Sequence, residues 1–158
     1  MGTDIYLSWD DMDEEEKERR HTGFSIGHGS FGYLRASIFM MEENAVLREV
    51  FPEECWEGGE HSYDFEGKFN ILPFLIKKYL SAKIFGFKIE PSEGQREQIT
   101  LGEKIISTFG GLGFETVLIP TNEDVEGAVE WANSLFKFFR LGTEKQKEGK
   151  DPKIYISW

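Results

Sequence analysis

The two ends of the chain carry the same alternation of apolar and polar residues. Residues 5–9 read Ile-Tyr-Leu-Ser-Trp, and residues 154–158 read Ile-Tyr-Ile-Ser-Trp. Such alternation is typical of a half-buried β-strand, in which successive side chains point to opposite faces. We therefore predict strands at 5–9 and 153–158 that are neighbours in one sheet, with tyrosine and serine side chains on one face.

Most of the chain between these strands is predicted to be helical. The spacing and flanking residues predict helices over 11–20, 42–50, 70–85, 92–109 and 121–141. Asp10 or Asp11 is expected to cap the first helix, and Gly142 is expected to end the last one.

Three other segments carry different patterns. Residues 114–119 predict a strand, and residues 33–41 fit a strand or a helix equally well. Residues 51–67 contain a proline, three glycines and several glutamates, which indicates a surface loop. Together these elements predict one globular domain over residues 1–158. Its fold class is α+β or α/β, with a small mixed sheet and helices packed on it.

The composition supports a packed core and restricts the partners. The 158 residues are 39% hydrophobic and include 14 phenylalanines, enough to bury a core. The formal net charge of −11 argues against nucleic acid, whose phosphates need a basic surface, and against an anionic membrane. A basic protein partner remains compatible with it, so an acidic inhibitor or immunity-like protein is one alternative.

No segment indicates secretion or membrane insertion. The N-terminus lacks a basic region followed by an apolar run. Lysines and a proline interrupt the longest apolar stretch, 71–87, which predicts a buried helix. The single cysteine, Cys55, excludes an intramolecular disulfide, and the glutamates around it disfavour a nucleophilic thiolate. These features predict a soluble cytoplasmic protein.

The glycine-rich segment 23–35 is the main candidate for a ligand site. Glycine permits positive φ angles and close backbone approach. The segment contains a G-x-G-x-x-G string, which in other contexts cradles phosphate, but no suitable strand precedes it. A polar pocket and a simple turn are the other interpretations. The predicted ligand-binding residues are His28, Tyr33 and Arg35, joined by His61 and Tyr63 from the acidic loop.

Enzymatic motifs are present only in part, so we assign no catalytic residue. Residues 23–27 fit G-x-S-x-G, but they follow a charged helix instead of a strand. Residues 11–13 fit D-x-D, but further glutamates follow and would repel phosphate. The histidines, including His21, lack the close spacing of metal ligands. We predict no metal and no cofactor.

The helix predicted at 121–141 suggests a subunit interface. Its apolar stripe comprises Val125, Ala128, Val129, Ala132, Leu135, Phe136 and Phe139. Trp131 and Phe138 lie about 100° to one side of that stripe and are aligned along the axis. Because aromatic residues are enriched at interfaces, these two side chains predict a homo-oligomer.

The first quarter of the chain resembles a group of uncharacterised prokaryotic proteins. The matching residues are Asp4 to Trp9, Glu16-Lys17, Thr22 to Ser25 and Gly32 to Arg35. That group begins D-I-Y-x-x-W and continues with a charged helix and then T-G-F-S and G-Y-L-R. The resemblance implies no activity, cofactor or partner.

From the sequence we therefore expect a binding or interaction protein, oligomeric and cytoplasmic. The ligand would be a small anion, or the partner a basic protein. The main alternative is an enzyme of unknown class that acts on a small polar or anionic ligand at residues 23–35.

Overall fold

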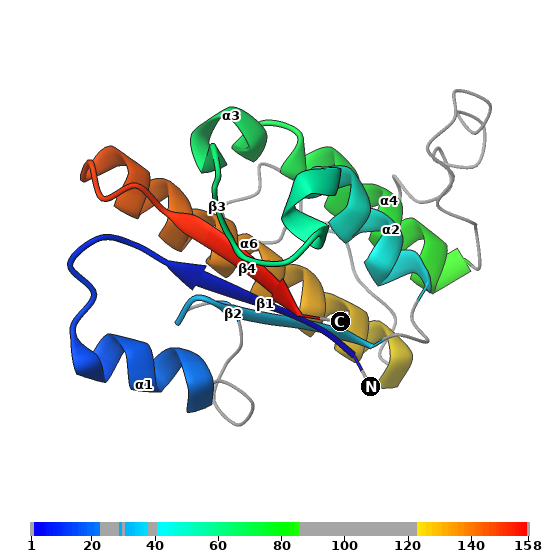
Figure 1. Ribbon diagram of the computed structural model, residues 1–158. Helices are drawn as coiled ribbons and strands as arrows, with labels where there is room; N and C mark the ends of the chain where they lie inside the picture. Colours follow the sequence, from blue (N-terminus) through cyan, green and yellow to red (C-terminus); the bar gives the residue numbers. More distant parts are fainter. Residues whose placement is uncertain (1, 23–28, 30, 38–40, 86–122, 158) are drawn as a thin grey trace.

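A four-stranded antiparallel sheet forms the centre of the fold (Figure 1). The computed structural model describes residues 2–22, 29, 31–37, 41–85 and 123–157. The strands are β1 (Gly2–Ser8), β2 (Tyr33–Ser37), β3 (Glu60–Ser62) and β4 (Lys153–Ser157), in the spatial order β2-β1-β4-β3. All three pairings are antiparallel, so the α+β class is confirmed, whereas the described strands do not form a mixed sheet.

The two ends of the chain pair with each other, as their shared pattern predicts. Ile5 lies opposite Ile156, and Tyr6 lies opposite Tyr155. The tyrosine rings stack with centroids 6.1 Å apart. Residues directly opposite each other share a face of the sheet, so the pairing places both isoleucines on one side and both tyrosines on the other.

The two faces of the sheet differ in burial. One face carries Ile5, Leu7, Leu34, Ala36, Ile154 and Ile156, all buried in the core. The other face carries alternate residues of the same strands, among them Asp4, Tyr6, Ser8, Arg35, Lys153 and Tyr155. We call this second surface the polar face.

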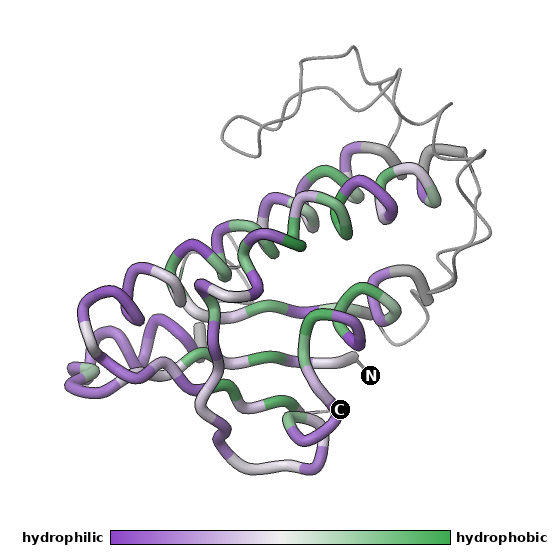
Figure 2. Tube along the Cα trace, turned by 90° about the horizontal axis from the view of Figure 1, so that it is seen from above, coloured by the Kyte–Doolittle hydropathy of each residue, from purple (hydrophilic) through white to green (hydrophobic). Residues whose placement is uncertain are grey.

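Helices cover the buried face of the sheet. They are α2 (Met41–Val50), α3 (Phe65–Phe69), α4 (Leu72–Phe85) and α6 (Glu123–Lys147), with a 3₁₀ turn at Glu53–Trp56. Figure 2 shows these helices along one side of the strands. Their apolar side chains and those of the strands form a single core cluster. Among the described helices, none is long and apolar enough to cross a membrane.

The helix α1 (Glu14–Thr22) begins later than expected. Its capping residue is Asp13, whose carboxylate accepts from the Glu16 amide at 2.7 Å. Glu16 reciprocates by accepting from the Asp13 amide, which completes a capping box. The prediction that Asp10 or Asp11 caps this helix is therefore wrong, and both carboxylates remain in the turn between β1 and α1.

The predicted end of the long C-terminal helix and the predicted loop at 51–67 are also wrong. Gly142 lies inside α6, where an added Cβ would collide with the ring of Phe65. Its small size therefore serves packing between α3 and α6. Residues 51–67 hold the 3₁₀ turn, β3 and the start of α3. The predicted elements at 92–109 and 114–119 lie outside the described residues.

Trp131 and Phe138 are core residues. Phe138 is fully buried between the rings of Phe51 and Phe65, with centroids 6.2 and 5.9 Å away. Trp131 packs on Tyr79 at 4.5 Å and donates from its indole to the Arg35 carbonyl. The interface prediction for these two side chains is therefore wrong. The apolar stripe of α6 is wider than the strict helical spacing suggests, because α3, α4 and the sheet all pack against it.

Candidate functional site

The predicted ligand residues Tyr33 and Arg35 interact with an acid of the same chain. Both lie on the polar face, opposite β1 residues. The Tyr33 hydroxyl donates to Asp4 at 2.6 Å, and the Arg35 Nε lies 3.5 Å from the same carboxylate oxygen. Burial, and then the Asp4 hydrogen bond and charge, raise the pKa of Tyr33. Asp4 is thus an anionic neighbour of both Tyr33 and Arg35 within the same chain.

His61 and Tyr63 do not join Tyr33 and Arg35. His61 lies opposite the buried Ile154, so it belongs to the other face of the sheet, and its Nε2 contacts the Gly58 carbonyl at 2.8 Å. Tyr63 is buried, and its hydroxyl donates to the Val50 carbonyl at 2.7 Å. The prediction that these residues form one pocket with Tyr33 and Arg35 is wrong. His28 lies outside the described residues.

The described part of the glycine-rich segment is a tight turn that leads into β2. Gly29 and Gly32 have φ angles of 84° and 77°. The Gly29 amide donates to the Tyr33 carbonyl, and the Gly32 carbonyl accepts from the Leu7 amide. Gly29 comes so close to the backbone of Ser134 in α6 that an added Cβ would collide with it. These glycines bring the turn against a helix of the same chain.

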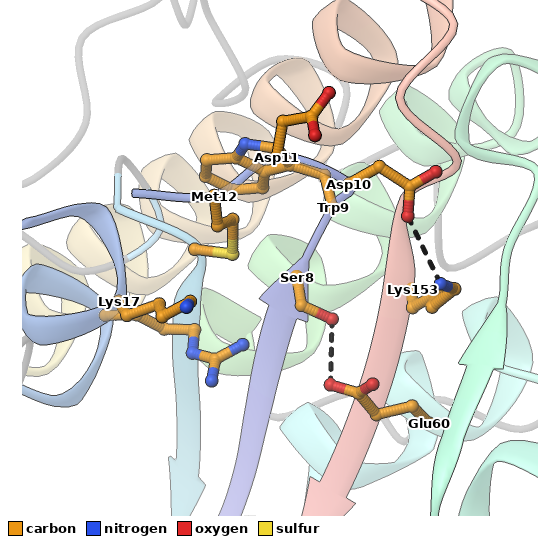
Figure 3. A pocket seen from close by; sticks show the side chains of 9 residues that line it. Ser8, Trp9, Asp10, Asp11, Met12, Lys17, Glu60 and Lys153 are labelled. Carbon is orange, nitrogen blue, oxygen red and sulfur yellow. Dashed lines mark hydrogen bonds and ion pairs between the residues drawn. The ribbon is translucent and has the colours of Figure 1, made fainter. Parts of the chain in front are cut away.

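A cavity of about 350 Å³ opens at the end of β1, on the polar face of the sheet (Figure 3). We call it the β1-end pocket. Its lining consists of Ser8, Trp9, Asp10, Asp11, Met12, Lys17, Arg20, Glu60 and Lys153. Three of these side chains are cationic and three are acidic. They come from β1, the following turn, α1, β3 and β4, so the sheet and the helix together define the site.

Arg20 is held at one side of this pocket by two contacts. Its Nη1 donates to the Leu7 carbonyl at 3.2 Å, and its guanidinium lies 5.8 Å from the centre of the Tyr6 ring. Its Nε is buried and has no hydrogen-bond partner in the structure. No described carboxylate forms an ion pair with Arg20, although the chain has 29 acidic residues against 18 basic ones.

The opposite side of the pocket holds two polar pairs. The Ser8 hydroxyl donates to Glu60 at 2.9 Å, and the Lys153 ammonium lies 3.4 Å from Asp10 (Figure 3). The hydrogen bond and charge of Asp10 raise the pKa of Lys153. Asp151 lies 3.7 Å from the same ammonium, which therefore has two carboxylate neighbours. Lys153 is held by acids of its own chain, whereas Arg20 is not.

Trp9 also lines this pocket. Its side chain is 7% exposed, yet the structure gives its indole Nε1 no hydrogen-bond partner. A buried donor without an acceptor costs about 1–3 kcal/mol. Two such donors, Trp9 Nε1 and Arg20 Nε, therefore belong to residues that line one cavity.

The sequence contained only weak signals of this pocket. Arg20 resembles a residue placed for the helix dipole, and Asp10 and Asp11 resemble caps. Two features of the sequence could have indicated the pocket. One is the run of polar residues that follows β1, and the other is the pairing of the terminal strands, which brings Lys153 opposite Ser8. Glu60 was not predictable, because β3 lies in a segment that reads as a loop.

Cys55 is separate from this site. Its side chain is buried, and burial followed by the charge of Glu54 raises the pKa of its thiol. Because the thiolate is the reactive form, we expect a thiol reagent at neutral pH to label the native protein only as fast as the core opens. Labelling kinetics with and without denaturant test this. Rapid stoichiometric labelling of native protein would contradict the buried placement.

Metal ligation finds no support among the described residues. Within that part of the chain no three His, Cys, Asp or Glu side chains are grouped to hold an ion. The side chains of His21 and His28 are not among those described. Comparison with family models, curated proteins and solved structures finds no match to this chain.

Proposed function

We propose that this protein binds a small anionic ligand, a carboxylate or a phosphate, in the β1-end pocket. The observation that carries the proposal is Arg20, which lines this cavity and has no acidic partner among the described residues. The local positive charge of this guanidinium attracts an anion, whereas the net charge of −11 of the whole chain opposes it.

Arg20 is the principal donor in this proposal because its position is fixed. The Leu7 carbonyl and the Tyr6 ring hold the guanidinium, so little side-chain entropy is lost when an anion binds. A guanidinium can donate two parallel hydrogen bonds to a carboxylate or a phosphate. Lys17 is a second cation at the rim, although it also pairs with Glu14 at 2.7 Å on the surface.

The location is the second part of the proposal: we place the protein in the cytoplasm. Cys55 is the only cysteine of the sequence, and its thiol is free and buried. A lone free thiol is compatible with a reducing compartment, where disulfides do not stabilise small domains. Fractionation of the native host with an antibody to this chain tests the placement.

Replacing Arg20 with glutamine is expected to abolish most of the anion binding. Titration of the wild-type protein with acetate or inorganic phosphate should perturb the amide NMR signals of residues 8–12 and 17–20. The variant should bind about tenfold more weakly, because hydrogen bonds to charged groups contribute about 1.5–3 kcal/mol. The titration is performed at constant ionic strength, since salt screens exposed charges.

Arg19→Gln is the matched control. Arg19 is the adjacent residue of the same helix, pairs with Glu15, and does not line the β1-end pocket. This variant changes the net charge by the same amount and should retain wild-type affinity. Equal losses in both variants, or wild-type perturbations confined to other parts of the protein, would contradict the proposal. Thermal unfolding of both variants verifies that they remain folded.

A further inference from the structure

The β1-end pocket brings a cation and an acid together without pairing them. Arg20 comes from α1, Ser8 from β1 and Glu60 from β3, and all three residues line the pocket. Glu60 accepts the Ser8 hydrogen bond, and Arg20 donates to the Leu7 carbonyl. No ion pair joins these two described side chains. Opposite charges that line one small cavity and remain apart leave room for a ligand that contacts both.

The hydrogen-bonding capacity of the two sides is complementary. Arg20 and Lys17 have only N–H donors. The Ser8 proton is directed to Glu60, so the Ser8 oxygen and the second Glu60 oxygen remain as acceptors. One side therefore recognises an anion, and the other side recognises a donor such as a protonated amine.

The lysine near Glu60 does not cancel this acceptor site. Lys153 forms its ion pairs with Asp10 and Asp151, at 3.4 and 3.7 Å. The charge of Glu60 contributes to the raised pKa of Lys153, but no ion pair or hydrogen bond joins the two described side chains. Two carboxylates thus neutralise the single ammonium, and Glu60 adds negative charge on that side.

We propose that the ligand of this pocket is a zwitterion, with an anionic group on Arg20 and a protonated amine on Ser8 and Glu60. This inference rests on the proposed function, because it takes the Arg20 anion site as its first half. It adds the second contact and the chemical class of the ligand, an amino acid or a similar amino-substituted anion. The cavity of about 350 Å³ suits a molecule of that size.

Matched pairs of small molecules test the inference. Glycine, β-alanine and γ-aminobutyrate are titrated beside acetate, propionate and butyrate, with amide NMR signals as the readout and ionic strength held constant. The three lengths cover different separations of the two charges. At least one amino acid should bind about two- to fivefold more tightly than its matched carboxylate, the range expected for an exposed charge pair. Butylamine alone should bind more weakly than either.

The variant Glu60→Gln should remove this gain and leave carboxylate binding intact. The amide oxygen of glutamine still accepts from Ser8, so the fold of β3 is retained while the negative charge is lost. Glu57→Gln is the control, because Glu57 is an exposed residue of the preceding loop outside the pocket lining. It should preserve the preference for the amino acid.

The outcomes separate the two proposals. If carboxylates bind through Arg20 and no amino acid binds more tightly than its partner, the zwitterion inference is overturned and anion binding stands. If the preference survives in Glu60→Gln, the inference is overturned as well. If neither class of molecule perturbs the residues of the pocket, both proposals fail.

Discussion

The substitution Phe138→Glu is expected to unfold the protein. Phe138 is fully buried between Phe51 and Phe65, and its ring also lies 6.3 Å from that of Phe139. Loss of a buried phenylalanine costs about 3–5 kcal/mol, and an unpaired buried carboxylate adds further cost. Since domains are stable by only about 5–15 kcal/mol, most of the stability is lost. Circular dichroism and chemical denaturation measure the effect.

The matched control is the same substitution on the surface. Phe74 is 51% exposed in α4, and its ring lies 4.5 Å from the Lys78 ammonium. A glutamate at position 74 would lie one turn before Lys78, an arrangement that favours an ion pair. Phe74→Glu should therefore change the stability by less than about 1 kcal/mol. A folded Phe138→Glu variant with wild-type stability would contradict the core position of Phe138.

Should Phe138→Glu yield no soluble protein, Phe138→Ala provides the measurement. It creates a cavity without adding a charge, so the free energy of unfolding should fall by about 3–5 kcal/mol. A fall below about 1 kcal/mol would show that the side chain is exposed or that the site collapses without cost.

The terminal strands show what local pattern can establish. Alternation at 5–9 and 154–158 predicts strands, and their likeness predicts that they pair. The register that places Tyr6 opposite Tyr155 agrees with that prediction. Both strands bury one face against helices, so the alternation records a true difference in environment. The alternation of apolar and polar residues predicts a strand reliably where the tertiary contacts bury the same side chains that the pattern marks as apolar.

Gly142 and the β1-end pocket show where local pattern fails. A glycine near the end of an apolar stripe resembles a helix terminator, but Gly142 is required by the Phe65 ring packed against it from α3. Arg20 is held in its position by the Leu7 carbonyl and the Tyr6 ring, two contacts with β1. Both depend on contacts between distant elements, and spacing along the chain does not encode them.

In the glycine-rich segment, the local pattern predicts one feature of the structure and misses another. Its composition predicts an unusual backbone path, and the positive φ angles of Gly29 and Gly32 agree with that prediction. The identity of the neighbour was not predictable. Gly29 approaches the backbone of Ser134 in α6. The neighbour of this glycine is therefore part of the protein, whereas the sequence also allowed a bound ligand in that place.

The substitution Gly29→Ala is therefore expected to destabilise the fold severely, for two separable reasons. The φ angle of 84° is unfavourable for a residue with a Cβ, at a cost of about 1–2 kcal/mol. The new methyl group would also lie about 2.7 Å from the Ser134 carbonyl carbon and closer still to its oxygen. Backbone atoms of a buried helix cannot move aside as a side chain can, so the total loss should reach about 3 kcal/mol or more.

Gly58→Ala separates these two contributions. Gly58 has a nearly identical φ angle of 88°, but an added Cβ would meet no atom within 4 Å. It should therefore lose only the conformational part, about 1–2 kcal/mol. The difference between the two variants, measured as free energies of unfolding in denaturant, isolates the collision with α6. Equal losses in Gly29→Ala and Gly58→Ala would mean that the turn before β2 does not pack on Ser134, and the tight contact between that turn and α6 would have to be abandoned.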